Sequence, residues 1–202
     1  MNKADLKFIF VHGLSGWGSY DPINRIFPYW GLSGGSIIKY LRRQGYECYD
    51  ASVSKTLSAW NRACELYAQL KGTVTDYGKE HSSRYNHERF GKDFTGNPLI
   101  KDFDNSEIVL IGHSFGGATI RLFQELLING FKKEMEVTEE DDLSSFFKGG
   151  RKNQIFAMVL LACPNNGTTA YDLYEDESFD INSIKIDEKY LKTGGMVSKG
   201  TS

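Results

Sequence analysis

The segment Ile108–Gly117 constrains the fold of this chain more than any other. Its first four residues are large and aliphatic without polar alternation, which is typical of a strand buried on both faces of a parallel sheet. The next residues, Gly112–Gly116, have the form G-x-S-x-G, and apolar residues at helical spacing follow them as far as Gly130. Strand, serine turn and helix together are the context in which this motif forms a nucleophile elbow.

The chemistry of such an elbow explains its spacing. A strand turns into a helix over so few residues only if Ser114 adopts a strained backbone conformation, and Gly112 and Gly116 allow the two elements to approach closely. The Ser114 hydroxyl is then exposed, and the backbone N–H of Phe115 at the helix N-terminus can donate to an oxyanion. The alternative is a chance match in a glycine-rich chain.

Composition limits the classes of protein that this sequence can form. The 202 residues are 40% hydrophobic and 25% charged, enough for one domain with a substantial core. A net charge of -2 favours neither nucleic acid nor an anionic membrane as partner. No apolar run has the length of a membrane span, and the N-terminus lacks the apolar core of a signal peptide. We therefore expect a soluble chain, with compartment and oligomeric state undetermined.

The three cysteines are odd in number and widely spaced, which does not favour a framework of disulfides or metal ligands. Cys48, Cys64 and Cys163 each fall within or at the end of an expected strand or helix. Buried reduced thiols are favoured over disulfides or a metal site.

A second functional loop is expected near the N-terminus. Leu6–Val11 is typical of a buried strand and leads into the glycine-rich segment His12–Gly18. Beside a nucleophile elbow, such a loop supplies the second oxyanion donor, here the backbone N–H of Leu14. The alternative is an ordinary glycine-rich connection that His12 holds by hydrogen bonds.

The order of the remaining elements indicates the fold class. Strands are expected at Tyr46–Val53 and Ile155–Leu161, and a helix between Ser58 as N-cap and Gly72. This alternation predicts an α/β protein with a doubly wound, mainly parallel sheet, formed by one domain over residues 1–202.

The segment between Gly72 and Asn105 shows no clear periodicity, so we expect it to lack regular elements. A segment of this length without such elements in a compact domain usually has a function or is held in place by a metal ion. His81 and His87 lie six residues apart within it. Asn86 tolerates a left-handed conformation that would let the two imidazoles converge. The pair is either part of a zinc site or two surface or hydrogen-bonded histidines.

An acidic run follows the elbow helix. Its members are Glu134, Glu136, Glu139, Glu140, Asp141 and Asp142. Their spacing fits no calcium loop, so a solvated loop or short helix is expected.

Taken together, these motifs resemble one known family. The sequence is similar to the zinc-containing thermoalkalophilic lipases of Gram-positive bacteria, of the staphylococcal and Geobacillus type, within the α/β-hydrolase superfamily. The matching motifs run in order through most of the chain: Val11-His12-Gly13, Gly16-Trp17, Tyr29-Trp30-Gly31, Trp60, Arg62-Ala63, Glu65, Asp76-Tyr77-Gly78, His81, His87, Arg89-Phe90-Gly91, the elbow, Leu126-Leu127, Asn129-Gly130, Leu143–Gly150, Pro164 and Asn166-Gly167-Thr168.

The resemblance implies a carboxylic ester hydrolase that acts on triacylglycerol or related esters. Ser114 would be the nucleophile that forms an acyl-enzyme, and the N–H groups of Leu14 and Phe115 would form the oxyanion hole. Lipid or small esters would be the substrates, and Trp17, Tyr29 and Trp30 near the cleft would suit acyl chains. Members of the family are largely secreted.

The resemblance also implies zinc as a cofactor. His81 and His87 match two of the family's zinc ligands, and residues 73–104 would be the zinc-loop insertion. Asn61 stands where the family has an aspartate ligand. A neutral amide is a poorer ligand than a carboxylate, so the site should be weakened or empty. The family's calcium ligands lie in a C-terminal part that this chain does not contain, so no calcium site is expected.

The catalytic triad of this class has the order serine, acid, histidine. The four histidines are His12, His81, His87 and His113, and none follows Ser114. We therefore expect the N-terminal part of a lipase, truncated on its C-terminal side and with little activity alone. One alternative is a catalytically dead hydrolase-fold domain that binds a lipid, a partner or zinc. Another is a different serine hydrolase, such as a peptidase or thioesterase.

Overall fold

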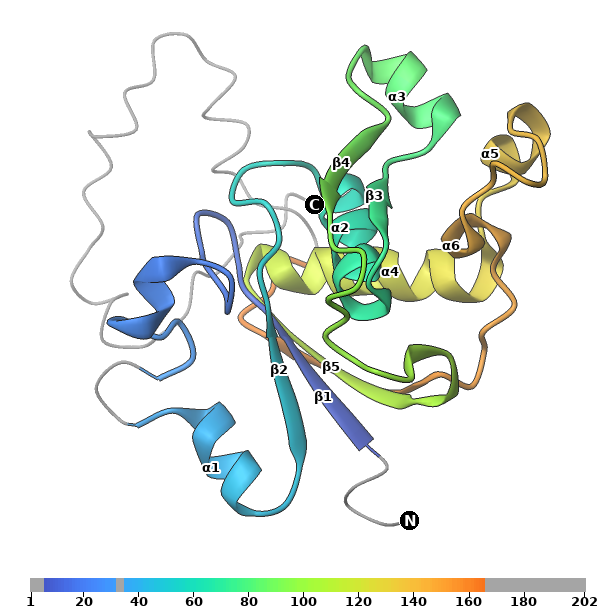
Figure 1. The fold of residues 1–202 in the computed structure, drawn as a ribbon. Helices are drawn as coiled ribbons and strands as arrows, with labels where there is room; N and C mark the ends of the chain where they lie inside the picture. Colours follow the sequence, from blue (N-terminus) through green and yellow to red (C-terminus); the bar gives the residue numbers. More distant parts are fainter. Residues whose placement is uncertain (1–5, 32–34, 166–202) are drawn as a thin grey trace, which may run out of the picture.

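The computed structural model describes residues 6–31 and 35–165 of the chain, and Figure 1 shows their arrangement. A four-stranded sheet lies at the centre, with helices on both of its faces. In chain order the elements are β1 (Leu6–Val11), the 3-10 helix η2 (Pro22–Arg25), α1 (Ile37–Arg43), β2 (Glu47–Ala51), α2 (Ala59–Lys71), β3 (Val74–Asp76), α3 (Lys79–Tyr85), β4 (Phe90–Asp93), the 3-10 helix η3 (Phe103–Asn105), β5 (Glu107–His113), α4 (Phe115–Asn129), α5 (Lys132–Val137), α6 (Ser145–Lys148) and β6 (Ile155–Leu161).

The sheet is parallel throughout and has the strand order β2-β1-β5-β6. The chain goes from β1 outward to β2, then returns across the sheet to β5 on the other side of β1. The order therefore reverses between β1 and β5, whose carboxyl ends lie side by side, with Val11 opposite Gly112. Such a switch point is where open α/β sheets hold their ligands. The predicted α/β class with a doubly wound, mainly parallel sheet is confirmed.

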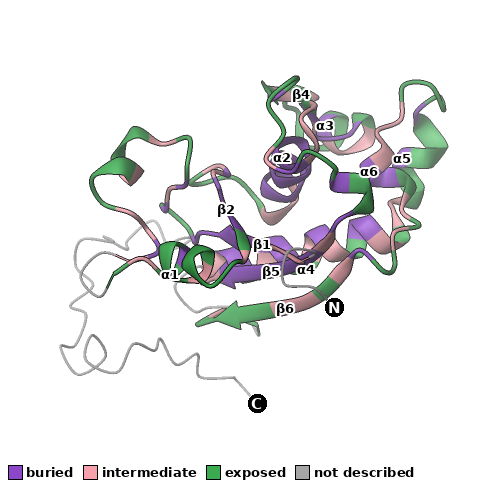
Figure 2. Ribbon diagram, turned by 60° about the horizontal axis from the view of Figure 1, so that its bottom comes forward, coloured by how far each residue is buried: buried purple, intermediate pink, exposed green. Residues whose placement is uncertain are grey.

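Alternate residues of the central strands pack on opposite faces of the sheet. Ile9 and Leu110 belong to a large cluster with residues of α2 and α4, whereas Phe10 and Val109 pack with residues of α1. Each fully buried aliphatic side chain contributes about 1.5–3 kcal/mol. The run at Ile108 lacks polar alternation because both faces of β5 are covered, as Figure 2 shows by its buried colouring.

The strand β6 differs from the central strands. Its only neighbour among the described strands is β5, and it is largely exposed in Figure 2. Phe156 is 53% exposed and Leu161 is 40% exposed. The predicted bounds of this strand, Ile155–Leu161, are those observed.

Residues 73–104 contain regular elements, contrary to the prediction that none would form there. Strands β3 and β4 pair antiparallel in a small second sheet, and α3 lies between them. Arg89 fastens this unit through two hydrogen bonds of 3.0 and 2.8 Å to the carboxylate of Asp76. Elements this short depend on such contacts, which periodicity does not reveal.

Two predictions about polar and thiol groups need correction. Glu134, taken as part of a solvated acidic run, is fully buried on α5. Cys48 and Cys64 are buried free thiols as predicted, but Cys163 is only partly buried.

The motif residues Asn166, Gly167 and Thr168 lie outside the described residues. Within the described part of the chain, no helix has the length and apolar character needed to cross a membrane.

Candidate active site and histidine pocket

Ser114 occupies a strained turn between β5 and α4. Its φ of 53° and ψ of −126° lie in a region that non-glycine residues rarely adopt. The strand ends at His113 and the helix begins at Phe115, so a single residue makes the change of direction. This geometry is that of a nucleophile elbow, and it leaves the serine partly exposed at the carboxyl edge of the sheet.

The glycines on either side of Ser114 are required by close packing. A Cβ at Gly112 would lie 2.7 Å from the backbone of Gly116. A Cβ at Gly116 would lie 2.2 Å from the carbonyl oxygen of Val11. Since real Cβ atoms do not approach other atoms so closely, any side chain at these positions would push the helix away from the strands.

The loop after β1 packs directly against the elbow. A Cβ at Gly13 would lie 2.8 Å from the Cβ of Ser114, so this glycine lets the loop touch the serine. Ser15 has a φ of 55° and donates its N–H to the carbonyl oxygen of Lys55 at 2.8 Å. The N–H groups of Leu14 and Phe115, the expected oxyanion donors, make no hydrogen bond with any residue that the structure describes.

Tyr29 connects this loop to the elbow. Its hydroxyl accepts a hydrogen bond of 3.0 Å from the N–H of Gly13 and lies 2.6 Å from Nδ1 of His113. Burial raises the pKa of Tyr29 and lowers the pKa of His113, so both groups are neutral at pH 7 and the hydroxyl can donate to the imidazole. The sequence motifs predict Tyr29 as part of the Tyr29-Trp30-Gly31 motif and as a side chain that suits acyl chains, and they do not indicate this bridge to His113. Trp30 is 8% exposed and packs on Phe10, so it does not line an open cleft.

No general base for Ser114 is found among the described residues. His12 is fully buried, its Nδ1 lies 2.8 Å from the carbonyl oxygen of Gly13, and burial lowers its pKa. His113 is engaged by Tyr29. No described residue forms a hydrogen bond with the Ser114 hydroxyl. The elbow therefore has its strained turn and two unpaired N–H groups, without a histidine in contact with the hydroxyl.

The two histidines of the insertion come together in a second site. Asn86 ends α3 in a left-handed conformation, with φ 52° and ψ 54°, as the sequence suggested. The chain then turns back, so that the rings of His81 and His87 lie with centroids 5.3 Å apart. Trp60 stacks on His81 with centroids 4.7 Å apart and planes 13° apart.

A cavity of about 540 Å³ opens beside the histidine pair, and Asn61 also lines it. Burial, with smaller effects of the charges on His87 and Arg84, lowers the pKa of His81 to about 4. His81 is therefore neutral at pH 7, the form that binds a metal ion. Nδ1 of His87 lies 2.8 Å from the carbonyl oxygen of Glu88, an arrangement that fixes the ring and leaves Nε2 for a ligand.

These groups fit only half of a tetrahedral zinc site. The oxygen of Asn61 already accepts a hydrogen bond of 2.5 Å from the Ser58 hydroxyl. The described residues contain no group of three or more histidine, cysteine, aspartate or glutamate side chains that could hold a metal ion. The pocket therefore offers two imidazoles and a neutral amide, together with Glu80, whose carboxylate lies 3.8 Å from Arg84, where zinc sites commonly have four strong ligands.

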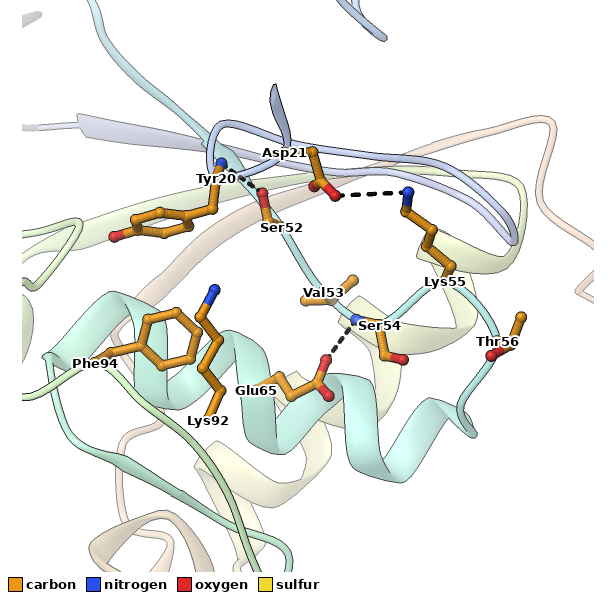
Figure 3. A pocket seen from close by; sticks show the side chains of 10 residues that line it. All are labelled: Tyr20, Asp21, Ser52, Val53, Ser54, Lys55, Thr56, Glu65, Lys92 and Phe94. Carbon is orange, nitrogen blue, oxygen red and sulfur yellow. Dashed lines mark hydrogen bonds and ion pairs between the residues drawn. The ribbon is translucent and has the colours of Figure 1, made fainter. Parts of the chain in front are cut away.

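A further cavity, of about 430 Å³, lies beside the loop after β1, and no motif in the sequence indicates it. Figure 3 shows the side chains around it: Tyr20, Asp21, Ser52, Val53, Ser54, Lys55, Thr56, Glu65, Lys92 and Phe94. Glu65 accepts a hydrogen bond of 2.5 Å from the N–H of Ser54, and Lys55 lies 3.6 Å from Asp21. These contacts fix the segment after β2, on which the loop after β1 rests through Lys55.

A parallel α/β sheet with a strained serine at the switch point defines a protein of the α/β-hydrolase class. Residues 4–190 match the model of the family described as lipase-like, C-terminal domain. The chain belongs to this family.

Named relatives agree with this assignment. The chain is 41% identical over 193 residues to Lipase 1 of Staphylococcus aureus strain MRSA252, and 41% identical over 181 residues to a lipase of Staphylococcus epidermidis. Among solved structures, Staphylococcus hyicus lipase is 37% identical, has a TM-score of 0.75 and matches 96% of this chain. Lipase 1 of Pelosinus fermentans is 34% identical, has a TM-score of 0.77 and matches 85% of the chain.

The chain covers only part of these proteins. It spans 28% of the Staphylococcus aureus relative and 26% of the Staphylococcus epidermidis relative. In the solved lipases of Staphylococcus hyicus and Pelosinus fermentans it corresponds to 48% and 45% of the chain. The resemblance to the staphylococcal lipases is confirmed for the region that is shared.

Proposed function

We propose that this chain carries the nucleophile half of a lipase-type carboxylic ester hydrolase. The Ser114 oxygen attacks the ester carbonyl, and the N–H groups of Leu14 and Phe115 stabilise the resulting oxyanion. The ester C–O bond then breaks, the alcohol leaves with the proton that came from the serine hydroxyl, and an acyl-enzyme remains. The observation that carries this proposal is the positive φ of Ser114 at the junction of β5 and α4, against which Gly13 packs. Membership of the lipase-like family supports the ester as the substrate class.

An apolar acyl group is the part of the substrate that the surroundings favour. Leu14 in the loop after β1 is 58% exposed, and Ile26 and Phe27 are 73% and 51% exposed. Trp17 joins these segments by donating a hydrogen bond of 2.7 Å to the carbonyl oxygen of Phe27. Exposed apolar side chains next to the expected oxyanion donor suit the hydrocarbon of a lipid or small ester.

The 202-residue chain alone turns over esters slowly in this account, because no histidine follows Ser114. Loss of one triad member costs several orders of magnitude in rate, while the oxyanion hole retains a residual effect of about 10³–10⁴ over water. A chimaera tests this directly: the present chain replaces the matched region of Staphylococcus hyicus lipase.

The chimaera should hydrolyse p-nitrophenyl butyrate, whereas the 202-residue chain and the chimaera with Ser114→Ala should not do so measurably. A folded but inactive chimaera would contradict the proposal, and so would activity that survives Ser114→Ala. Strong turnover by the 202-residue chain, abolished by Ser114→Ala, would retain the nucleophile and refute the need for a downstream histidine.

We also propose that the histidine pocket binds zinc weakly. His81 and His87 would hold the ion, which when bound would tie α3 to the segment after it; Asn61 contributes at most a neutral oxygen. Metal analysis after dialysis of the zinc-loaded chain tests this, and we expect less than one zinc per chain. Stoichiometric zinc would show that the amide is an adequate ligand. Identical retention after His81→Ala together with His87→Ala would place the metal elsewhere.

The second candidate function is a catalytically dead domain that binds a lipid, a partner or zinc. The absence of a described hydrogen-bond partner for the Ser114 hydroxyl favours it. It predicts that the chimaera stays inactive although it folds.

A further inference from the structure

Arg62 on α2 is fully buried, which is unusual for a residue whose charge cannot be neutralised at pH 7. Burial lowers its pKa to about 10, so the guanidinium remains charged. No carboxylate forms a salt bridge with it among the described residues. Its hydrogen bonds go to one hydroxyl and to backbone carbonyl oxygens, and all of them lie near the elbow.

The guanidinium joins the loop after β1 to the elbow helix α4. Nε donates a hydrogen bond of 3.0 Å to the Thr119 hydroxyl, and Nη2 donates to the carbonyl oxygen of His12. Nη1 donates to the carbonyl oxygens of Gly13 at 3.3 Å and of Ser54 at 2.7 Å. The guanidinium carbon also lies 5.3 Å from the centroid of the Phe115 ring.

The contacts of the Gly13 carbonyl oxygen determine the direction of the Leu14 N–H. Besides the bond from Arg62, this oxygen lies 2.8 Å from Nδ1 of His12 and accepts the N–H of Gly16 at 3.2 Å, so Arg62 is one of three groups that hold it. The carbonyl of Gly13 and the N–H of Leu14 belong to the same peptide unit, which is planar and trans, so they point in opposite directions. Holding the Gly13 carbonyl against Arg62 therefore keeps the Leu14 N–H turned away from the guanidinium, and no described residue accepts a hydrogen bond from it. The N–H of Gly13 is held by Tyr29, so this peptide segment is fixed from both sides.

We infer that Arg62 is a positioning residue for the oxyanion hole, which it serves by fixing the Gly13–Leu14 peptide plane relative to Ser114. This inference rests on the proposed function, since the oxyanion hole has meaning only for an ester hydrolase. The planar fork of arginine suits these four acceptors at once, and the point charge of a lysine does not. Arg62→Lys should therefore retain the charge and lose the orientation.

The experiment measures the rate constant with which a fluorophosphonate modifies Ser114 in the 202-residue chain. Removing one oxyanion donor costs about 10²–10³ in rate, and a misoriented donor should cost at least about tenfold. Arg62→Lys should lower the rate constant at least about tenfold, while the fraction of folded protein stays the same as in wild type. Arg42→Lys is the matched control, because Arg42 also donates to a backbone carbonyl, that of Cys48 at 2.6 Å, but lies on α1 away from the elbow.

Thr119→Val separates positioning from simple packing. It removes the acceptor on α4, together with the bond of 3.2 Å that this hydroxyl donates to the carbonyl oxygen of Phe115. The bonds of Arg62 to His12 and Gly13 remain, so Thr119→Val should slow phosphonylation less than Arg62→Lys. Equal losses in the two variants, or a loss that merely follows the unfolded fraction in urea titrations, would overturn the inference. An unchanged rate constant in Arg62→Lys would overturn it as well.

Hydrogen exchange distinguishes failure of this inference from failure of the proposed function. If Ser114 of the wild-type chain is not phosphonylated at all, the proposed function fails, and exchange alone decides the role of Arg62. Arg62→Lys should accelerate exchange in residues 13–16 at least about tenfold more than in β1, a difference that matches the loss of one to two net hydrogen bonds. A uniform change, or none, would show that the guanidinium does not fix the loop.

Discussion

The hydroxyl of Tyr29 lies 2.6 Å from Nδ1 of His113, the residue that immediately precedes Ser114. The same hydroxyl accepts the N–H of Gly13 at 3.0 Å. One phenol group therefore joins the end of β5 to the loop after β1, across the switch point of the sheet. Together with Arg62, it fixes the backbone on both sides of Ser114 before any substrate binds.

Replacing Tyr29 by phenylalanine should destabilise the chain. The change leaves the Gly13 N–H and the His113 imidazole without their partner, which costs about 1–3 kcal/mol for a buried group. Urea unfolding measures the loss. Tyr40→Phe is the control, because Tyr40 is 57% exposed, and its unfolding free energy should stay within about 0.5 kcal/mol of wild type. Equal stability of both variants would show that the Tyr29 hydroxyl is dispensable.

Asp50 on β2 should make stability depend on pH. Burial raises the pKa of Asp50 from 3.8 to about 6, although Asn24 donates to it at 2.8 Å. The folded chain then binds more protons than the unfolded chain between these values, so this group's contribution to stability falls as the pH rises from about 4 to about 6. Above that window the loss is constant, at about 2–3 kcal/mol.

Asp50→Asn removes the titration and keeps an oxygen acceptor for Asn24. In urea unfolding, the variant should gain stability relative to wild type as the pH rises through the same window, and the difference should level off near pH 7. Parallel stability curves of the two proteins between pH 4 and pH 7 would contradict the raised pKa of this carboxyl.

Glu134 should support the helix that carries His81. Its buried carboxylate accepts the N–H groups of Lys79 and Glu80 at the start of α3, and the hydroxyl of Thr138 at 2.8 Å. Glu134→Gln loses the charge and one acceptor oxygen, which should cost about 1.5–3 kcal/mol of unfolding free energy.

The matched control for Glu134 is two residues away. Glu136 is on the same helix, with a side chain 57% exposed, and among the described residues it pairs with Lys132 alone, at 3.6 Å. Glu136→Gln should change stability by less than about 0.5 kcal/mol. Equal effects of the two substitutions would show that the carboxylate of Glu134 does not cap α3.

Asn61→Asp should strengthen metal binding in the histidine pocket. A carboxylate next to His81 and His87 supplies the anionic oxygen that zinc prefers, so the zinc dissociation constant should fall by at least about tenfold. Calorimetric titration of the metal-free variant and wild type measures the change. Asn129→Asp, on α4 outside the pocket, is the control. If Asn61→Asp binds no better than wild type, the pair of histidines is not a zinc site.

The sequence predicts the central strand, the helix α2 and the turn at Asn86 because the residues that determine each of them are close together in the chain. The aliphatic run before Gly112 requires cover on both faces, and Ser58 and Gly72 begin and end α2 as their chemistry requires. Asn86 was expected to reverse the chain because few residues tolerate its conformation. Each of these predictions depends on one residue type and its immediate neighbours.

The parts that the sequence did not predict depend on contacts between distant segments. Glu134 is buried because its carboxylate accepts a backbone N–H at the start of α3, more than 50 residues earlier in the chain. No local sequence pattern indicates this contact. Arg62 did carry a signal, since it lies four residues before Leu66 on the apolar face of α2. A charge in that position indicates a buried partner, but only the fold identifies the carbonyls of His12 and Gly13.

The most direct test of this account is covalent modification of Ser114 itself. The chain is incubated with a fluorophosphonate, digested and analysed by mass spectrometry, with Ser114→Ala and denatured wild type as controls. We expect a phosphonyl group on Ser114 of the folded chain, none on the nearby loop residue Ser15, and none on Ser114 after denaturation, because the strained turn and the two N–H donors exist only in the fold. A folded wild-type chain whose Ser114 reacts no faster than Ser15, or than its own denatured form, would contradict the claim that this serine is a nucleophile.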